Sequence, residues 1–265
     1  MKIGVFDSGL GGLLITKAFV TSLSQYDYAY LGDTKRVPYG NRSHDTIYEF
    51  LKEGVQFLFE NDCKLIIVAC NTASAQALRR IQQEYLPIHY PDRRVLGVII
   101  PTCESALEDD SVKAVGILAT SATVASQAYV HELHKINPHI LVFQQAAPLL
   151  VPFVENDSIH LAGPALMEYL VPFAGKIDAL LLGCTHYPIL RHEIEEIVGP
   201  NVKIVSQDEI IPKKLANYLT RHPEIERDLS KGGTCHLFVT DLTHSMKNSV
   251  SKWFGDIVGL EVVEL

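Results

Sequence analysis

The sequence predicts an α/β fold made of two similar lobes, each with a mostly parallel sheet, related by pseudo-two-fold symmetry. Short apolar runs recur along the 265 residues, and most are followed by a small-residue turn and a helical pattern. The runs are rich in Val, Ile and Leu, as expected of parallel strands that helices cover on both faces. Two runs are alike, Leu65–Ala69 and Leu180–Gly183, and each is followed by a cysteine almost half the chain apart from the other.

In the first half of the chain, each expected strand leads into a turn or a helical pattern. The strands are expected at Lys2–Phe6, Tyr28–Leu31, Leu65–Ala69, Val95–Ile100 and Ala114–Leu118. The helices are expected at Leu13–Leu23, Ala73–Tyr85, Glu104–Glu108 and Thr123–Ile136. Small and polar residues stand between most strands and their helices, as in the short turns of βα units.

The second half continues the same alternation. The strands are expected at Ala179–Leu182, Lys203–Val205 and His236–Thr240, and the helices at Ile189–Val198, Glu209–Leu219 and Ser245–Phe254. The last strand has no third lobe to join, so we expect it to return to the first sheet. The predicted domains are therefore 1–97 plus 208–265 for the first lobe and 98–207 for the second.

Composition restricts the function classes. Hydrophobic residues make up 47% and charged residues 20% of the chain, and the net charge is −8. This acidic balance argues against nucleic-acid binding as the main function, because phosphates are bound by basic surfaces. No apolar run approaches the roughly 18 residues of a membrane span, and Asp7 interrupts the first run. The five cysteines form no CxxC pair, so we expect free thiols and a cytoplasmic protein.

Cys70 and Cys184 are the strongest candidates for chemistry. Each follows a buried strand and opens a helical pattern, where ligands bind in α/β sheets and the helix dipole favours a thiolate. A single cysteine in such a place is more often a small buried hydrophobe, but two at equivalent strand ends indicate a role. We expect Cys63, Cys103 and Cys235, which lack this context, to be structural.

The loop that follows the first strand, Asp7 to Gly12, suits a carboxylate ligand. It contains neither the dinucleotide fingerprint nor a P-loop, but its glycines allow a tight turn with exposed N–H groups. Asp7 can point into the cleft or cap the following helix. Tyr39, between a proline and Gly40, fits either a gate for the ligand or ordinary packing.

Other polar residues lie near the second strand end. Thr120 and Thr123 suit carboxylate binding or helix capping, and His186 stands two residues after Cys184. Zinc would need three or four ligands, and disulfide exchange usually uses CxxC. Two opposed thiols can instead remove a proton from one face of a carbon and return one to the other. The expected substrate is a stereocentre beside a carboxylate.

Four motifs together resemble the glutamate racemases of bacterial cell-wall synthesis. They are Asp7-Ser8-Gly-Leu-Gly-Gly, Leu-Gly-Asp33 with Pro38-Tyr39-Gly40, Cys70-Asn71-Thr72, and Cys184-Thr185-His186-Tyr-Pro. The resemblance covers nearly the whole chain. It implies two α/β domains, an active site between them, no cofactor and no metal, and D-glutamate supplied for peptidoglycan synthesis. It is compatible with a homodimer.

The resemblance also implies residue roles. Cys70 and Cys184 match the acid/base thiols, and Asp7 and His186 match the residues that assist them. Glu155, which is uninformative from sequence alone, matches an acidic residue near the second thiol in some members. The matching substrate contacts are Asp7, Ser8, Tyr39, Gly40, Asn71, Thr72, Thr120, Thr123, Thr185 and His186.

Two other functions compete with this one. A related isomerase would act on aspartate, hydantoins or another α-substituted acid. A binding protein would keep the cleft without catalysis, although the presence of both Cys70 and Cys184 speaks against it. Loss of optical rotation from L-glutamate, with L-aspartate as the control, separates the three.

Overall fold

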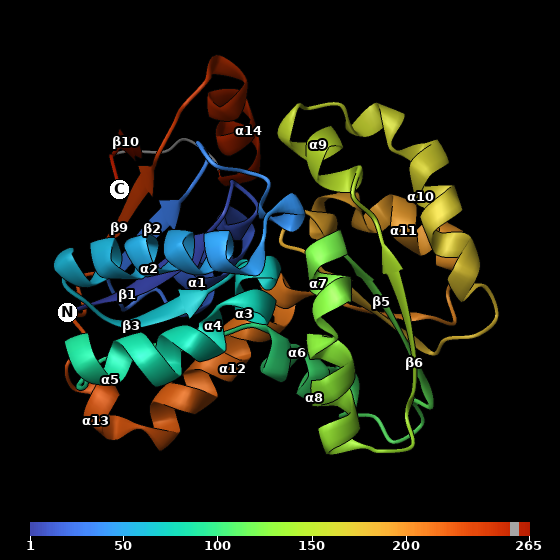
Figure 1. Cartoon of the computed structure of the whole chain (residues 1–265), viewed down its shortest axis with the longest axis horizontal. Helices are drawn as coiled ribbons and strands as arrows, with labels where there is room; N and C mark the ends of the chain where they lie inside the picture. Colours follow the sequence, from blue (N-terminus) through green and yellow to red (C-terminus); the bar gives the residue numbers. More distant parts are fainter. Residues whose placement is uncertain (255–259) are drawn as a thin grey trace.

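Two parallel β-sheets form the centres of two lobes that lie beside one another (Figure 1). The computed structural model describes residues 1–254 and 260–265. Within this part of the chain, all strand pairings in both sheets are parallel. The α/β fold with two parallel sheets, predicted from the alternation of strands and helices, is confirmed.

The four strands of the second sheet have the same order as four neighbouring strands of the first. Within the described residues the first lobe has the order β10-β9-β2-β1-β3-β4 and the second has β6-β5-β7-β8. The first sheet consists of β1 (Lys2–Asp7), β2 (Tyr28–Gly32), β3 (Cys63–Val68), β4 (Arg94–Gly97), β9 (Cys235–Val239) and β10 (Leu260–Val262). The second consists of β5 (Ala114–Ala119), β6 (Leu141–Ala146), β7 (Ala179–Gly183) and β8 (Lys203–Val205). Numbered within each lobe, both contain the series 2-1-3-4, so the lobes repeat one topology.

The chain leaves the first sheet after β4 and returns to it at β9, which pairs with β2. The predicted domain limits, 1–97 plus 208–265 and 98–207, stay a prediction. In each lobe the direction of winding reverses beside the first strand, between β1 and β3 and between β5 and β7. Ligands of α/β sheets bind at the carboxyl ends of strands at such switch points.

Helices connect the strands and cover the sheets. In the first lobe and its links they are α1 (Gly12–Ser22), α2 (His44–Glu60), α3 (Asn71–Gln76), α4 (Leu78–Arg80), α5 (Leu86–His89), α12 (Gln207–Arg221), α13 (Pro223–Glu226) and α14 (His244–Phe254). Around the second sheet they are α6 (Ile99–Ala106), α7 (Ser121–Ser126), α8 (Ala128–Ile136), α9 (Leu150–Glu155), α10 (Gly163–Leu170) and α11 (Arg191–Val198).

Several predicted elements have the wrong limits. The helix expected at Glu104–Glu108 ends at Ala106, and the helix expected at Thr123–Ile136 is interrupted at Gln127, between α7 and α8. The strand expected at Val95–Ile100 ends at Gly97, and α6 begins at Ile99, because a short apolar run does not distinguish a strand from the start of a buried helix. The helix expected at Ala73–Tyr85 begins at Asn71 and is interrupted after Gln76. Its last part, Ile81–Tyr85, is a π-helical turn.

Several elements lie outside the sequence predictions, among them β6, β10, α2, α9 and α10. The strand β6 is an edge strand whose residues are exposed or half-buried, and its apolar residues 141–143 are followed by the polar Gln144 and Gln145. The helix α2 is amphipathic and is capped by Ser43, whose hydroxyl accepts a hydrogen bond from the Thr46 N–H at 3.3 Å.

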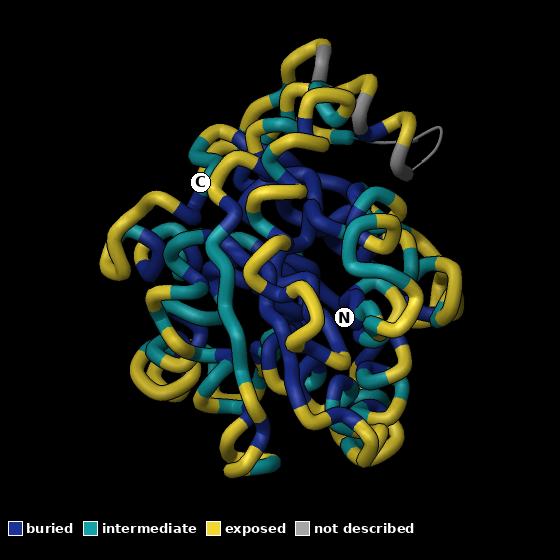
Figure 2. The backbone as a smooth tube through the Cα atoms, turned by 90° about the vertical axis from the view of Figure 1, so that its right-hand side faces the viewer, coloured by how far each residue is buried: buried dark blue, intermediate teal, exposed yellow. Residues whose placement is uncertain are grey.

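In the described residues, the buried apolar side chains form three clusters. One cluster extends from the first lobe into the second, and a further cluster lies within each lobe. Figure 2 shows buried stretches in the interior and exposed stretches around them. In residues 1–254 and 260–265, no helix is long and apolar enough to cross a membrane.

Candidate active site

The strand ends at the two switch points bring the predicted site residues to facing walls of the two lobes. Asp7 ends β1, Cys70 follows β3, and Cys184 follows β7. Thr185, next to Cys184, donates its hydroxyl to Asp7 Oδ1 at 3.2 Å, which joins the second lobe to the first. The thiols Cys70 and Cys184 are 4% and 6% exposed.

Cys70 belongs to the first wall. Its thiol donates to Ser8 Oγ at 3.2 Å, and its sulfur accepts the Ala73 N–H at 3.4 Å as the cap of α3. Burial, together with the negative charge of Asp7, raises the pKa of Cys70 to about 12. In the closed arrangement this sulfur is therefore a thiol at neutral pH and can act as an acid.

Asp7 lies at the bottom of the same wall. Its Oδ2 accepts the N–H groups of Gly9 and Gly12, each at 3.1 Å. Gly12 is the first residue of α1, so the carboxylate does satisfy the start of that helix. Burial raises the pKa of Asp7, and the charge of His186 and the two N–H groups oppose this shift. The charge on Asp7 in turn acts on Cys70.

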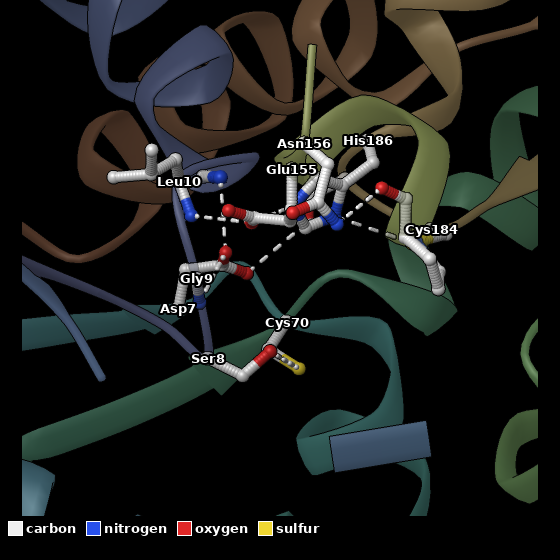
Figure 3. Close-up of polar contacts among 12 residues, drawn as sticks. Asp7, Ser8, Gly9, Leu10, Cys70, Glu155, Asn156, Cys184 and His186 are labelled. Atoms are coloured by element: carbon white, nitrogen blue, oxygen red, sulfur yellow. Dashed lines mark hydrogen bonds and ion pairs between the residues drawn. The ribbon is translucent and has the colours of Figure 1, made fainter. Parts of the chain in front are cut away.

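The second wall carries a chain of polar groups from Glu155 to Cys184 (Figure 3). His186 Nε2 donates to Glu155 Oε1, and His186 Nδ1 lies 3.6 Å from Cys184 Sγ. Glu155 Oε1 also accepts the Leu10 N–H of the opposite lobe at 3.2 Å. These contacts place Glu155, at the end of α9, in direct contact with His186.

The charges of this pair stabilise each other. Burial disfavours a charged imidazole, but the Glu155 carboxylate and Cys184 outweigh it and raise the pKa of His186 well above its usual value. Burial also disfavours the Glu155 carboxylate, but His186 outweighs it and lowers the pKa of Glu155. A protonated His186 directs its Nδ1–H at the sulfur of Cys184.

Three threonines predicted to bind the substrate contact one another between the lobes. Thr72 Oγ1, in the first lobe, lies 2.9 Å from Thr120 Oγ1 and 3.4 Å from Thr123 Oγ1, in the second. Gly40 is packed so closely that a Cβ there would lie 2.9 Å from Thr120 Cβ. The lobes are therefore closed in this region, and that these threonines bind the substrate stays a prediction.

The side chain of Tyr39 is directed into the first lobe. Its hydroxyl donates to Asp33 Oδ2 at 2.5 Å, and its ring packs against Phe6 and Phe50. This favours packing over gating for the side chain. What the segment offers to the cleft is the main chain at Gly40.

Sequence reasoning missed two further buried residues beside the site, Tyr129 and Gln207. Both form hydrogen bonds with the side chain of Asn71, at 2.6 Å from Tyr129 and at 2.6 and 2.8 Å from Gln207. Gln207 follows the strand β8, so the strand-end rule that selected the cysteines also points to it. Tyr129 lies within α8 and carries no local signal.

Comparison with known proteins decides the family. Residues 14–208 match the family model described as Asp/Glu/Hydantoin racemase. The chain belongs to this racemase family. The glutamate racemase of Aquifex pyrophilus is 42% identical over 93% of this chain and 91% of that protein.

Solved structures of this racemase family have the same fold. The glutamate racemase isoform RacE1 of Bacillus anthracis is 31% identical and has a TM-score of 0.90 over 100% of this chain and 97% of that one. The glutamate racemase of Francisella tularensis, in complex with D-glutamate, is 34% identical with a TM-score of 0.88 over 99% and 97%. Membership makes this chain an isomerase, as predicted.

The residues that match the family model include both Cys70 and Cys184. The match begins after the loop that contains Asp7. The individual roles given to the site residues stay predictions. Among residues 1–254 and 260–265, no three His, Cys, Asp or Glu side chains are grouped so as to hold a metal ion. That the reaction needs no metal and no cofactor stays a prediction as well.

Proposed function

We propose that this protein is a glutamate racemase that interconverts L-glutamate and D-glutamate with Cys70 and Cys184 as paired acid and base. The observation that carries the proposal is the placement of two buried thiols at corresponding strand ends of two facing lobes. Opposite faces of one α-carbon are within reach of two such groups, whereas a single base reaches only one face. The similarity to glutamate racemases supports glutamate as the substrate.

The proton balance follows from the two walls. With L-glutamate bound, a Cys184 thiolate takes the α-proton and becomes a thiol, and the Cys70 thiol donates its proton to the opposite face of the carbanion. The product is D-glutamate, with Cys70 left as a thiolate. The same steps in reverse begin at Cys70, and both assignments follow the family resemblance. Another turnover in the same direction requires both thiols to exchange protons with water.

The surroundings suit this starting state. Burial keeps Cys70 protonated, and a charged His186 directs an N–H at Cys184. The pair between His186 and Glu155 keeps that charge in a buried place. The threonine hydroxyls and the main-chain N–H groups beyond Asp7 are the groups we expect to hold the substrate carboxylates.

A racemisation assay tests the proposal. Circular dichroism should show loss of the L-glutamate signal to zero and the same from D-glutamate, whereas L-aspartate should keep its signal. In deuterated water, the newly formed enantiomer should carry deuterium at its α-carbon. Retention of the L-glutamate signal, or faster loss with L-aspartate, would refute glutamate racemisation.

Two further statements belong to this proposal. A cytoplasmic location is supported by five free cysteines, which a reducing compartment preserves. D-glutamate supply for peptidoglycan synthesis and assembly as a homodimer rest on the family resemblance. Sedimentation of the purified protein tests the second of these.

A further inference from the structure

A buried cluster of three polar side chains joins the lobes directly behind the thiols. Asn71 belongs to the first lobe, Tyr129 lies on α8 of the second, and Gln207 follows β8 of the second sheet. Their exposed fractions are 2%, 0% and 1%. Asn71 lies in one lobe and Tyr129 with Gln207 in the other, so the contacts of Asn71 depend on the closed arrangement of the lobes.

The hydrogen bonds of the cluster are reciprocal. Asn71 Nδ2 donates to Gln207 Oε1 at 2.8 Å, and Gln207 Nε2 donates back to Asn71 Oδ1 at 2.6 Å. The Tyr129 hydroxyl donates to Asn71 Oδ1 at 2.6 Å and accepts from Gln207 Nε2 at 3.0 Å. Burial raises the pKa of Tyr129 well above its usual value, so the hydroxyl remains a donor. Such a satisfied buried network fixes one relative position of its members.

Each end of the cluster adjoins a thiol. Asn71 is the first residue of α3, and Cys70 caps that helix through its sulfur. At the other end, a Cβ built on Gly183 would lie 3.4 Å from Tyr129 Cε2, so the ring rests against the main chain that leads into Cys184. A shift of Asn71 relative to Tyr129 therefore changes the position of one thiol relative to the other.

We propose that Tyr129 and Gln207 are positioning residues that set the separation of the Cys70 and Cys184 thiols by holding Asn71 across the lobes. The inference rests on the proposed two-thiol reaction. Neither residue is among the groups expected to touch the substrate. Their effect is on geometry, and proton transfer between a thiol and carbon is sensitive to displacements of about 1 Å.

Two variants remove the cluster's hydrogen bonds while they keep the shape of the site. Tyr129→Phe deletes the bridging hydroxyl and keeps the ring against Gly183, and Gln207→Met removes the reciprocal amide. The matched control is Tyr28→Phe. Tyr28 is equally buried, and its hydroxyl donates to Leu23 O at 2.8 Å within the first lobe. Each protein is assayed for kcat and KM in both directions.

A second readout does not depend on activity. Alkylation by iodoacetamide, followed for each cysteine by mass spectrometry, reports how often the cleft opens at Cys70 and Cys184. Cys63 and Cys103 are fully buried in the separate lobe cores and report unfolding of either lobe. One chain thus carries both the probes of the cleft and the internal controls.

For Tyr129→Phe and Gln207→Met, we expect kcat to fall about tenfold or more with KM changed by less than about threefold. Alkylation at Cys70 and Cys184 should rise about fivefold, the change expected from one neutral hydrogen bond, with Cys63 and Cys103 unchanged. Tyr28→Phe should match the wild type in both readouts.

The inference is overturned if both variants behave as Tyr28→Phe does, or if Cys63 or Cys103 becomes reactive together with the cleft thiols. Wild-type protein that fails to racemise glutamate would refute the proposed function instead. The alkylation rates would still decide whether Tyr129 and Gln207 hold the cleft closed. If one variant does not fold, the other gives the same comparison.

Discussion

Replacing Glu155 by glutamine tests whether the buried carboxylate keeps His186 charged. Oε1 accepts the N–H groups of Leu10 and His186, whereas Oε2 is buried and has no hydrogen-bond partner in the described residues. The amide nitrogen of Glu155→Gln can therefore take the place of Oε2 and leave both hydrogen bonds intact. The substitution removes a charge and changes the shape of the site little.

The magnitude follows from the change in one hydrogen bond. Charge-assisted hydrogen bonds are about twice as strong as neutral ones, so the imidazolium loses about 1–2 kcal/mol of stabilisation. Expressed as a rate, this is about a 5- to 30-fold fall in kcat/KM near neutral pH. The loss should fall equally on both directions, because the two enantiomers have equal free energy.

The effect of Glu155→Gln should depend on pH, because the substitution changes the pKa of His186. In the wild type the pKa of His186 is raised, so its charge persists through neutrality and is lost only as the pH rises through that raised pKa. In Glu155→Gln burial is opposed by Cys184 without the carboxylate, so the pKa of His186 is lower than in the wild type and the charge is lost at a lower pH. The deficit of the variant should therefore widen from about pH 6 to pH 9, at up to tenfold per pH unit.

The assay is kcat/KM for glutamate racemisation, measured by circular dichroism at intervals from pH 6 to pH 9. Glu168→Gln is the control, because Glu168 is an exposed carboxylate on α10 of the same lobe. This account of the pair between His186 and Glu155 would be refuted if Glu155→Gln loses less than about threefold in kcat/KM and if its kcat/KM falls at the same alkaline pH as in the wild type.

Three further predictions concern the thiols, the cleft and stability. Cys70→Ala and Cys184→Ala should each lower racemisation about 10²–10⁴-fold or more, and a Cys184→Ala protein within about tenfold of wild type would exclude the two-thiol mechanism. Gly11→Ala should lower kcat/KM about tenfold, because its Cβ would lie 2.9 Å from a main-chain nitrogen of the opposite lobe, whereas Gly163→Ala meets nothing within 4 Å and should be neutral. Asp27 accepts hydrogen bonds whose effect outweighs that of burial, so its pKa is lowered. The stability that this carboxylate gives the folded protein is therefore present above the unfolded pKa near 3.8 and is lost as the pH falls through the lower pKa of the folded state. Asp27→Asn should therefore lower Tm by roughly 4 °C at pH 7, with the gap closing in acid, and a gap that is independent of pH in thermal melts would contradict this.

The sequence by itself determined most of the strands, their parallel direction and the candidate site residues at their carboxyl ends. Apolar runs and small-residue turns are local features, so Lys2–Asp7, Cys63–Val68 and Ala179–Gly183 were recognisable from the chain alone. Because parallel strands direct their carboxyl ends to one edge, Cys70 and Cys184 could be selected before any contact was known. The edge strand β6 lies outside the sequence predictions although its residues 141–143 are apolar, because the polar Gln144 and Gln145 follow them where a buried strand would continue.

Only the tertiary structure decided which polar groups meet across the lobes. Glu155 carries no signal in its own segment, yet it contacts His186 and the Leu10 N–H. That Asn71 contacts the substrate stays a prediction, and only the structure shows that its side chain is hydrogen-bonded to Tyr129 and Gln207. The physical reason is that a strand or a turn is encoded by neighbouring residues. The partner of a buried charge or amide is set instead by how two separately formed lobes pack and exclude water between them.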